Sequence, residues 1–167
     1  MKNTKLQHQI IEEVDRFLHS RKSLMLSTLD KEGLPCSSYA PFTIYQQHLF
    51  IFISELALHT QHLIDHPQAS ILLIEDEDNC DDVFARIRLI YQIKADAISR
   101  ETELWPQVIE EMTTRLGDRV TLLSQLSDFI LFQLTPLFGR YVKGFGKAYE
   151  LTGDSLMLES VEHINKR

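Results

Sequence analysis

Residues 85–97, ARIRLIYQIKADA, alternate between apolar and polar side chains along almost their whole length. The odd-numbered positions from Ile87 to Ala97 are apolar, and the even-numbered positions are polar or charged except Ile90. Because successive side chains of a strand point to opposite faces, this period predicts one long strand with one buried face. Half-exposed strands are typical of antiparallel sheets, so the stretch favours an antiparallel sheet over a parallel βαβ arrangement.

The rest of the chain supplies further strands and a few helices. Helical spacing or helix boundaries mark residues 4–19, 57–66 and 102–116, the second stopped by Pro67 and the third by Gly117. Strands are expected at 23–29, in a hairpin after the turn DKEG, at 48–54, at 69–75, in DFILFQL before Pro136, and in two segments joined through GFG. Six or seven strands with few helices predict a mainly β fold, an antiparallel β-barrel with flanking helices.

Length and charge set the broad class. With 167 residues the chain is expected to form one domain, residues 1–167: an N-terminal helix over 1–20, a barrel with helical insertions over 21–152 and a C-terminal segment over 153–167. The net charge of −7 disfavours a nucleic-acid partner. The sequence contains no apolar segment long enough for a membrane span, and Cys36 and Cys80 match no metal spacing. These features predict a cytoplasmic protein without membrane or nucleic-acid contacts.

The stretch RYVKGFGKAYE, residues 140–150, resembles a phosphate-binding loop at first sight. A dinucleotide fingerprint needs a third glycine and a following helix, and neither is present. With period two, Val142, Gly144, Gly146 and Ala148 share one face, which would be almost bare backbone. Such a face admits a flat ligand, or else it lets two strands pack closely at a bulge.

Other polar clusters leave alternatives open. His59, His62 and His66 share a polar helix face, which is compatible with a metal site but is more often solvated or interfacial. The acidic run 75–82 lacks the spacing of a calcium loop and is expected to be a solvated turn. Arg86 and Arg88 could clamp a carboxylate or phosphate, or could be ordinary charges on a sheet face.

Five segments carry a family resemblance: RKSLMLSTLDKEGLPCSSYAPF, ISELALHTQHLIDHPQASILLIEDE, FARIRL, SQLSDFILFQL and YVKGFGKAYELTGD. Together, in this order, they resemble the HugZ/HutZ-type heme-utilisation family, a branch of the split-barrel proteins typified by pyridoxamine 5′-phosphate oxidase. The resemblance runs from about residue 20 to about residue 155. The last motif, with its GFG core, is the most distinctive of the five.

The resemblance implies a six-stranded Greek-key split β-barrel of the FMN-binding type. It also implies a homodimer with two equivalent ligand sites at the subunit interface, which hold heme in this branch. The chain is therefore expected to be a heme-binding, heme-utilisation protein that degrades heme to a biliverdin-like product and releases iron. This heme oxygenase-like oxidoreductase activity would need an external electron donor and would serve iron acquisition.

The resemblance also implies roles for particular residues. It assigns the axial ligand of the heme iron to His163 in the C-terminal segment, and a hydrogen bond to that histidine to Asp128. A carboxylate in this position fixes the tautomer of the imidazole and makes it a stronger donor. Asp128 and Arg88 are the predicted catalytic residues, with Arg88 near a propionate or the distal side. The other predicted heme contacts are His59, Lys143, Gly144, Phe145 and Gly146.

Two alternative functions fit the same fold. The first is an FMN-dependent pyridoxamine-phosphate-oxidase-like oxidoreductase, for which Arg21, Lys22 and Arg86 are candidate phosphate ligands. However, LALHTQHL has histidines where flavin-binding relatives commonly carry lysine. The second is a non-catalytic heme carrier or storage protein, which would use the same ligands as the enzyme.

Overall fold

The computed structural model describes residues 4–153, residue 156 and residues 160–164. The strands are β1 (Ser23–Leu29), β2 (Pro35–Tyr45), β3 (His48–Ser54), β4 (Gln68–Ile74), β5 (Arg88–Ile98), β6 (Phe129–Val142), β7 (Ala148–Thr152) and β8 (Ser160–His163). The helices are α1 (Thr4–Ser20), α2 (Leu58–Asp65), α3 (Leu104–Leu116) and α4 (Arg119–Ser124), with a 3₁₀ turn η1 (Glu77–Asn79). In this described part of the chain, no helix has the length and apolar character needed to span a membrane.

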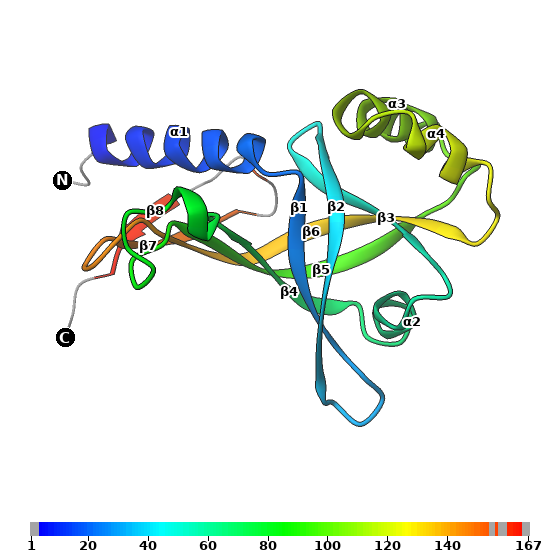
Figure 1. Ribbon diagram of the computed structural model, residues 1–167, viewed down its shortest axis with the longest axis horizontal. Coiled ribbons are helices and arrows are strands. Elements are labelled where there is room, and N and C mark those ends of the chain that lie inside the picture. The colour runs from blue at the N-terminus through cyan, green and yellow to red at the C-terminus, as the bar shows by residue number, and fades with distance from the viewer. Residues whose placement is uncertain (1–3, 154–155, 157–159, 165–167) are drawn as a thin grey trace.

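A closed antiparallel barrel forms the centre of the fold (Figure 1). Hydrogen-bonded neighbours follow the order β3-β2-β1-β4-β5-β6, and β3 also pairs with β6, which closes the ring. Strands β1, β2 and β3 follow one another as neighbours, and β4 returns beside β1, which is Greek-key order. The predicted mainly β, six-stranded antiparallel split barrel is confirmed, and so is the buried alternation of β5 from Leu89 to Ala95.

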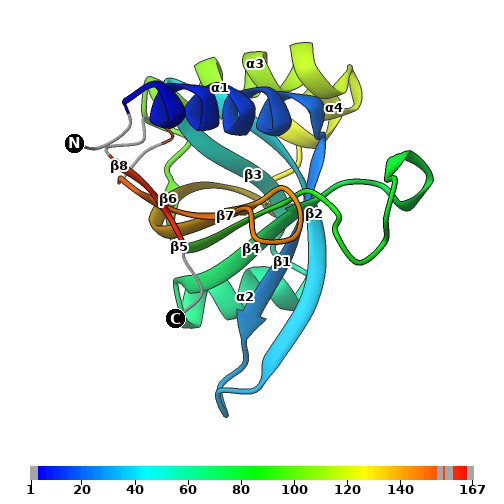
Figure 2. The same cartoon turned by 90° about the vertical axis from the view of Figure 1, so that its left-hand side faces the viewer.

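Strands β5 and β6 continue beyond the barrel as a two-stranded ribbon. The end of β6 pairs with β7, and β7 pairs with β8, so a small sheet extends from one side of the barrel. Helix α1 lies along this extension (Figures 1 and 2). The sequence did not indicate β8, because four residues within a polar segment give no recognisable period of their own.

Strand β6 runs through Pro136, where the sequence predicted a strand to end. Ile93 pairs with Pro136 while Gln92 pairs with Phe138, so Leu137 is an extra residue that forms a bulge. A bulge interrupts the ladder locally and therefore tolerates the missing N–H of proline. The predicted strand end is wrong for this reason, and one strand of 14 residues replaces two shorter ones.

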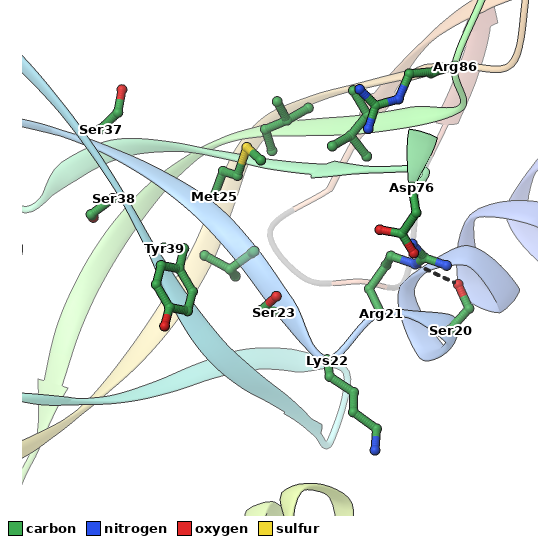
Figure 3. A pocket seen from close by; sticks show the side chains of 13 residues that line it. Ser20, Arg21, Lys22, Ser23, Met25, Ser37, Ser38, Tyr39, Asp76 and Arg86 are labelled. Atoms are coloured by element: carbon green, nitrogen blue, oxygen red, sulfur yellow. Dashed lines mark hydrogen bonds and ion pairs between the residues drawn. The ribbon is translucent and has the colours of Figure 1, made fainter. Parts of the chain in front are cut away.

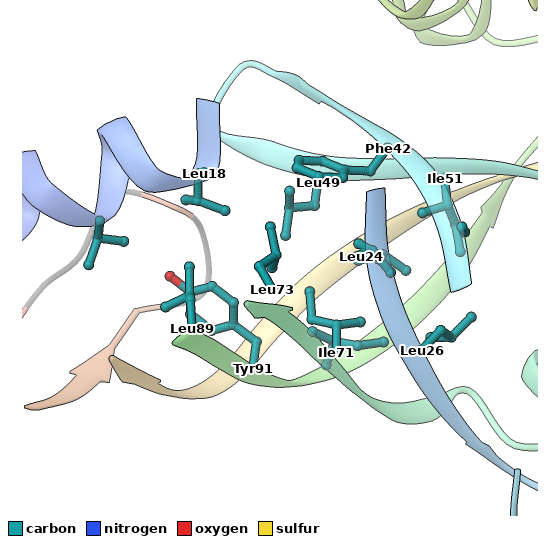
Figure 4. Packing of buried hydrophobic residues seen from close by; sticks show 14 of the residues in the cluster. Leu18, Leu24, Leu26, Phe42, Leu49, Ile51, Ile71, Leu73, Leu89 and Tyr91 are labelled. Atoms are coloured by element: carbon teal, nitrogen blue, oxygen red, sulfur yellow. The ribbon is translucent and has the colours of Figure 1, made fainter. Parts of the chain in front are cut away.

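Apolar side chains fill the barrel and the space beneath α1 (Figure 4). Ile10, Val14 and Leu18 supply the buried face of α1, as the helical spacing predicted. Leu18 belongs to the same cluster as Leu73 and Tyr91 from the sheet, and all three side chains are at most 2% exposed. Burial of this apolar stripe attaches α1 to the extended part of the sheet.

A second apolar cluster lies between the barrel and the helices α3 and α4. Val108 and Met112 of α3 pack with Phe52 of β3. Arg115 of the same helix donates a hydrogen bond of 3.3 Å to the carbonyl of Leu18, at the end of α1. Because the last carbonyls of a helix have no partner inside it, this contact stabilises the junction of α1 and the barrel.

Residues 143–147 form a tight turn between β6 and β7, which we call the glycine turn. The Lys143 N–H donates to the Lys147 carbonyl at 3.0 Å. Gly144 and Gly146 have φ angles of 138° and 69°, which favour glycine strongly over other residues. The predicted strand face of Gly144 and Gly146 is therefore wrong: the two glycines make the turn, and only Val142 and Ala148 belong to strands.

A partly buried ion pair joins α1 to the glycine turn. Lys143 Nζ lies 2.6 Å from Glu13 Oε2, and the two side chains are 19% and 18% exposed. Burial alone would raise the pKa of Glu13, but hydrogen bonds from Lys143 and Gln9 outweigh it and bring the pKa below its ordinary value of 4.5. The pair thus favours the ionised carboxylate in the folded state.

We expect Gly139→Ala to destabilise the protein by about 1–3 kcal/mol, because core overpacking costs this much. A Cβ atom at position 139 would lie 2.5 Å from Cε1 of Tyr91, whose ring is buried. Urea unfolding measures the change in free energy. Leu137→Ala, at an exposed position of the same strand, is the control and should change the free energy of unfolding by less than about 0.5 kcal/mol. Equal stability of Gly139→Ala and the parent protein would contradict the close packing.

A second variant tests the ion pair through pH. Since the folded state lowers the pKa of Glu13, its stabilisation is complete above pH 4.5 and is lost as the pH falls through the lower, folded value. Glu13→Gln should therefore reduce the free energy of unfolding by about 1–2 kcal/mol at pH 7. This difference in the free energy of unfolding between Glu13→Gln and the parent protein should become smaller at acidic pH. The exposed neighbour Glu12→Gln is the matched control, and a deficit of the same size at pH 3 would exclude this ion pair as the cause.

Candidate functional site

A groove of about 390 Å³ opens beside the glycine turn, and we call it the glycine-turn groove. It lies on the face of the sheet opposite to the face that α1 covers, since its strand residues alternate with Leu89, Tyr141 and Tyr149 of the core. Its lining consists of Phe84, Ala85, Arg88, Ile90, Arg140, Val142, Gly144, Phe145, Gly146, Ala148 and Ile164. Four residues predicted as ligand contacts are therefore brought together: Arg88, Gly144, Phe145 and Gly146.

Strand pairing builds the floor of this groove. Ile90 pairs with Arg140, and Val142 pairs with Arg88 on one side and with Ala148 on the other. Directly paired residues share a face, so the floor alternates apolar side chains with two guanidinium groups. The result is a shallow apolar surface with positive charge, suited to a flat ligand that carries acidic groups.

The two arginines differ in how firmly they are held. Arg88 is partly buried, and its Nη1 donates to the carbonyl of Arg86 at 3.1 Å. Arg140 is more exposed and lies 3.4 Å from Oε1 of Glu150 on β7. Arg140 and Phe84 are not among the residues that the sequence predicted for the site. For Arg140 the signal was available, because it precedes the core residue Tyr141 in an alternating segment.

Lys143 lies away from the groove although it adjoins it in sequence. Its side chain points toward α1 and pairs with Glu13, and its ammonium lies 5.9 Å from the centroid of the Tyr149 ring. The structure therefore does not bring Lys143 to the predicted ligand edge. The sequence period put Lys143 and Phe145 on one face, but the turn separates them.

His163 lies at the rim of the glycine turn rather than inside the groove. It pairs with Tyr149, and the two rings are 5.2 Å apart, so His163 shares the face of Tyr149. Its Nε2 is 2.9 Å from the carbonyl oxygen of Gly146. Because a carbonyl only accepts, Nε2 carries the proton in this contact. The exposed imidazole is thus joined to the same turn that forms one wall of the groove.

Asp128 and His59 lie at another part of the molecule, near the start of α2. Asp128 Oδ2 accepts a hydrogen bond of 3.0 Å from the hydroxyl of Ser54, at the end of β3. His59 is half-buried on α2, and burial together with the nearby charge of His62 lowers its pKa. Figure 1 shows α2 and the β7–β8 sheet on different sides of the barrel. Within one chain, Asp128 and His59 therefore lie apart from the glycine-turn groove.

The histidines of α2 do not form a metal cluster in the described residues, where no three His, Cys, Asp or Glu side chains are placed to share an ion. His62 instead contacts the buried hydroxyl of Thr28, with Nδ1 2.9 Å from Oγ1. This contact ties α2 to β1. The histidine face predicted from the sequence therefore has a structural partner within the chain.

A second cavity, of about 620 Å³, lies where α1 meets β1, β2 and the end of β4 (Figure 3). It contains Arg21 and Arg86, two of the candidate phosphate ligands. Arg21 is paired with Asp76 at 2.9 Å, and Arg86 is paired with Glu77 at 3.1 Å and also donates to a backbone carbonyl. The Lys22 side chain points away from the other two cations in Figure 3. Arg21 and Arg86 thus have acidic partners, and Lys22 points in a different direction.

The comparisons with known proteins agree with this architecture. The pyridoxamine 5′-phosphate oxidase family matches residues 10–143. The curated protein "Heme oxygenase HutZ" of Vibrio cholerae is 45% identical over 157 residues, which are 94% of this chain and 89% of that protein.

Two solved structures extend the comparison. The crystal structure of Vibrio cholerae HutZ, described as a heme storage protein, has a TM-score of 0.72 and covers 75% of this chain and 88% of its own. Campylobacter jejuni ChuZ is 31% identical with a TM-score of 0.84, over 94% of this chain and 63% of ChuZ. The predicted resemblance is confirmed: the chain belongs to the pyridoxamine 5′-phosphate oxidase family of split-barrel proteins, in the branch that includes HutZ.

Proposed function

We propose that this protein binds heme in the glycine-turn groove and degrades it oxidatively, with release of iron and a biliverdin-like product. The observation that carries the proposal is the composition of the groove, an apolar floor with Arg88 and Arg140 beside two glycines. The similarity to HutZ supports it, since that relative is named a heme oxygenase. The crystal structure of HutZ is described as that of a heme storage protein, so binding of heme is common to both descriptions.

The groove residues fit a porphyrin in chemistry. A porphyrin is flat and largely apolar, and Ile90, Val142 and Ala148 offer a flat apolar surface. Gly144 and Gly146 keep one wall free of bulk. Heme also carries two carboxylates, for which Arg88 and Arg140 are suitable partners.

A second copy of the chain would complete the site. Within one chain, Asp128 and His59 are separated from the groove and from His163, although family resemblance gives all of them to one site. Met25 and Tyr39 pair directly across β1 and β2 and are 54% and 68% exposed, an apolar surface that dimerisation would cover. We therefore place two equivalent heme sites at the interface of a homodimer.

Each site residue then has a defined task. His163 would bind the heme iron, and its imidazole would exchange its contact with the Gly146 carbonyl for that bond. Asp128 of the second copy accepts a hydrogen bond from the imidazole, which orients the ring and strengthens it as a donor. Arg88 neutralises a carboxylate, and the groove walls keep the porphyrin face oriented and limit access of water. Bound heme supplies the redox chemistry, with electrons from an external donor. Lys143 and His59 stay peripheral.

Cytoplasmic placement is part of this proposal. Cys36 and Cys80 form no disulfide, and two free thiols suit a reducing compartment. An oxidative reaction on heme would there have access to cellular reductants. Release of iron at this location would serve iron acquisition.

The alternative of an FMN-dependent oxidoreductase is favoured by the second cavity and by the family match. Arg21, Lys22 and Arg86 all line this cavity, and cations are what a flavin phosphate would need. However, Asp76 and Glu77 already pair with the two arginines. Binding an anion there would need these pairs to be exchanged, whereas Arg88 of the groove makes no ion pair with an acidic side chain among the described residues.

Hemin titration tests the proposed function. The purified protein should give a Soret band, and His163→Ala should lose or shift it because the axial ligand is gone. His66→Ala, at the histidine that follows α2 and lies outside the proposed site, is the control and should keep the band. A protein that carries FMN and shows no hemin affinity would overturn the proposal in favour of the flavin enzyme.

Asp128→Asn tests the predicted support of the axial ligand. The amide can keep the contact with Ser54, so the fold should be retained, but it accepts more weakly from an imidazole. Hemin affinity should fall by about tenfold, as for other outer partners of metal ligands. With ascorbate under oxygen, the Soret band should also bleach more slowly than in the parent protein.

Asp118→Asn, at an exposed position before α4, is the control for this variant. It should bind and bleach hemin as the parent protein does. If the parent protein binds hemin but its Soret band persists with ascorbate under oxygen, the protein is a carrier and the degradation step is rejected. Unchanged affinity and bleaching in Asp128→Asn would remove Asp128 from the site.

A further inference from the structure

Phe84 and Arg140 line the glycine-turn groove, but neither belongs to the set of residues that the sequence predicted. Resting on the proposed function, we infer that these two residues hold the porphyrin in the groove. Phe84 and Phe145 form apolar walls on its two sides, and Arg140 leaves Glu150 to bind one porphyrin carboxylate. Arg88 is then the partner of the other carboxylate.

The first observation is the exposure of two aromatic side chains at one groove. Phe84 is 81% exposed and Phe145 is 74% exposed, whereas every other phenylalanine of the described chain is buried or half-buried. They come from separate segments, Phe84 from the loop before β5 and Phe145 from the glycine turn. Exposed aromatic side chains gathered at a groove indicate contact with an apolar partner, and here the groove between them is only large enough for a small molecule.

The backbone around each phenylalanine is fixed. The Phe84 N–H donates to Oδ1 of Asp82 at 2.8 Å, and the Ala85 N–H donates to the Asp82 carbonyl at 3.0 Å. On the other side, the Lys147 N–H donates to the Gly144 carbonyl at 3.2 Å within the glycine turn. The backbone that carries each phenylalanine is therefore held in place before a ligand arrives, which lowers the entropy cost of binding.

The second observation is the weak hold on Arg140. Its ion pair with Glu150 spans 3.4 Å, and the two side chains are 46% and 41% exposed. Exposed pairs of this kind contribute little to stability, so exchange of Glu150 for a ligand carboxylate costs little. Arg88 and Arg140 stand diagonally across β5 and β6, since Arg88 pairs with Val142 and Ile90 pairs with Arg140. Two cations in diagonal positions can each reach one of two carboxylates on a single ligand.

A hemin titration of paired variants tests the role of Arg140. Arg140→Gln should weaken hemin binding by about five- to tenfold, the effect of a lost charged hydrogen bond. Glu150→Gln should instead raise hemin affinity, because it removes the competing carboxylate. With hemin dimethyl ester, which has no free carboxylates, both variants should bind as the parent protein does. Equal losses in Arg140→Gln and Glu150→Gln would show that only their ion pair matters, and would overturn the assignment of Arg140.

Metal-free protoporphyrin IX tests Phe84 without axial ligation. In a His163→Ala background, its fluorescence should report binding to the groove, and Phe84→Ala should weaken that binding by about three- to tenfold, the range of an aromatic contact. Val83→Ala, at an exposed neighbouring position that does not line the groove, is the matched control and should have no effect. Unchanged porphyrin affinity in Phe84→Ala would overturn the assignment of Phe84.

The outcomes separate this inference from the proposed function. If the parent protein binds neither hemin nor protoporphyrin IX, the proposed function fails and the inference with it. If it binds hemin through His163 while the Arg140 and Phe84 variants bind equally well, heme binding stands and only the groove assignment fails. Circular dichroism of each variant confirms that a loss of affinity is not a loss of fold.

Discussion

The pairing of β5 with β6 is the interaction on which the rest of the structure depends. It extends from Arg88 opposite Val142 to Ile98 opposite Leu131, so one ribbon serves both the barrel and the groove. At its barrel end it allows β6 to meet β3 and close the ring. At its other end it presents the groove floor on one face and the surface for α1 on the other. A change that disturbs this ladder would therefore affect closure, helix packing and ligand contacts together.

Sequence periodicity predicted the segments in which apolar and polar side chains alternate regularly. The alternation from Leu89 to Ala95 gave β5, and it put Arg88 on the open face where the groove lies. Periodicity predicted the structure wrongly at proline and glycine. Pro136 lies at a bulge within a strand instead of ending it. Gly144 and Gly146 form a turn instead of one face of a strand. Strand β8 escaped detection because its formation depends on β7, a tertiary contact that a short segment does not encode.

The candidate site was only partly predictable for a different reason. The glycine motif and Arg88 share one groove, but Asp128 lies near Ser54, beyond the reach of the groove within one chain. In the proposed dimer the residues of one site come from two copies, so they lie apart within a single copy. The structure also adds Phe84, which lies in an irregular acidic loop where no period marks it. Exposure of a large aromatic side chain is visible only once the chain is folded.

The bulge at Leu137 has a consequence for how the two ends of the ribbon can vary. Before it, Phe132 and Leu134 of even number face the core, whereas after it Gly139 and Tyr141 of odd number do. One extra residue thus shifts the numbering of the inward positions, while the pairing of Arg140 with Ile90 keeps Arg140 on the groove face. Loss of Leu137 alone would remove the bulge but would leave Arg140 opposite Ile90 on the groove face, because Gly139 would then continue the inward alternation of Leu134 and Pro136. The groove thus depends on the pairing of β6 with β5 rather than on the number of residues along β6, a dependence that comparison of residue types alone would overlook.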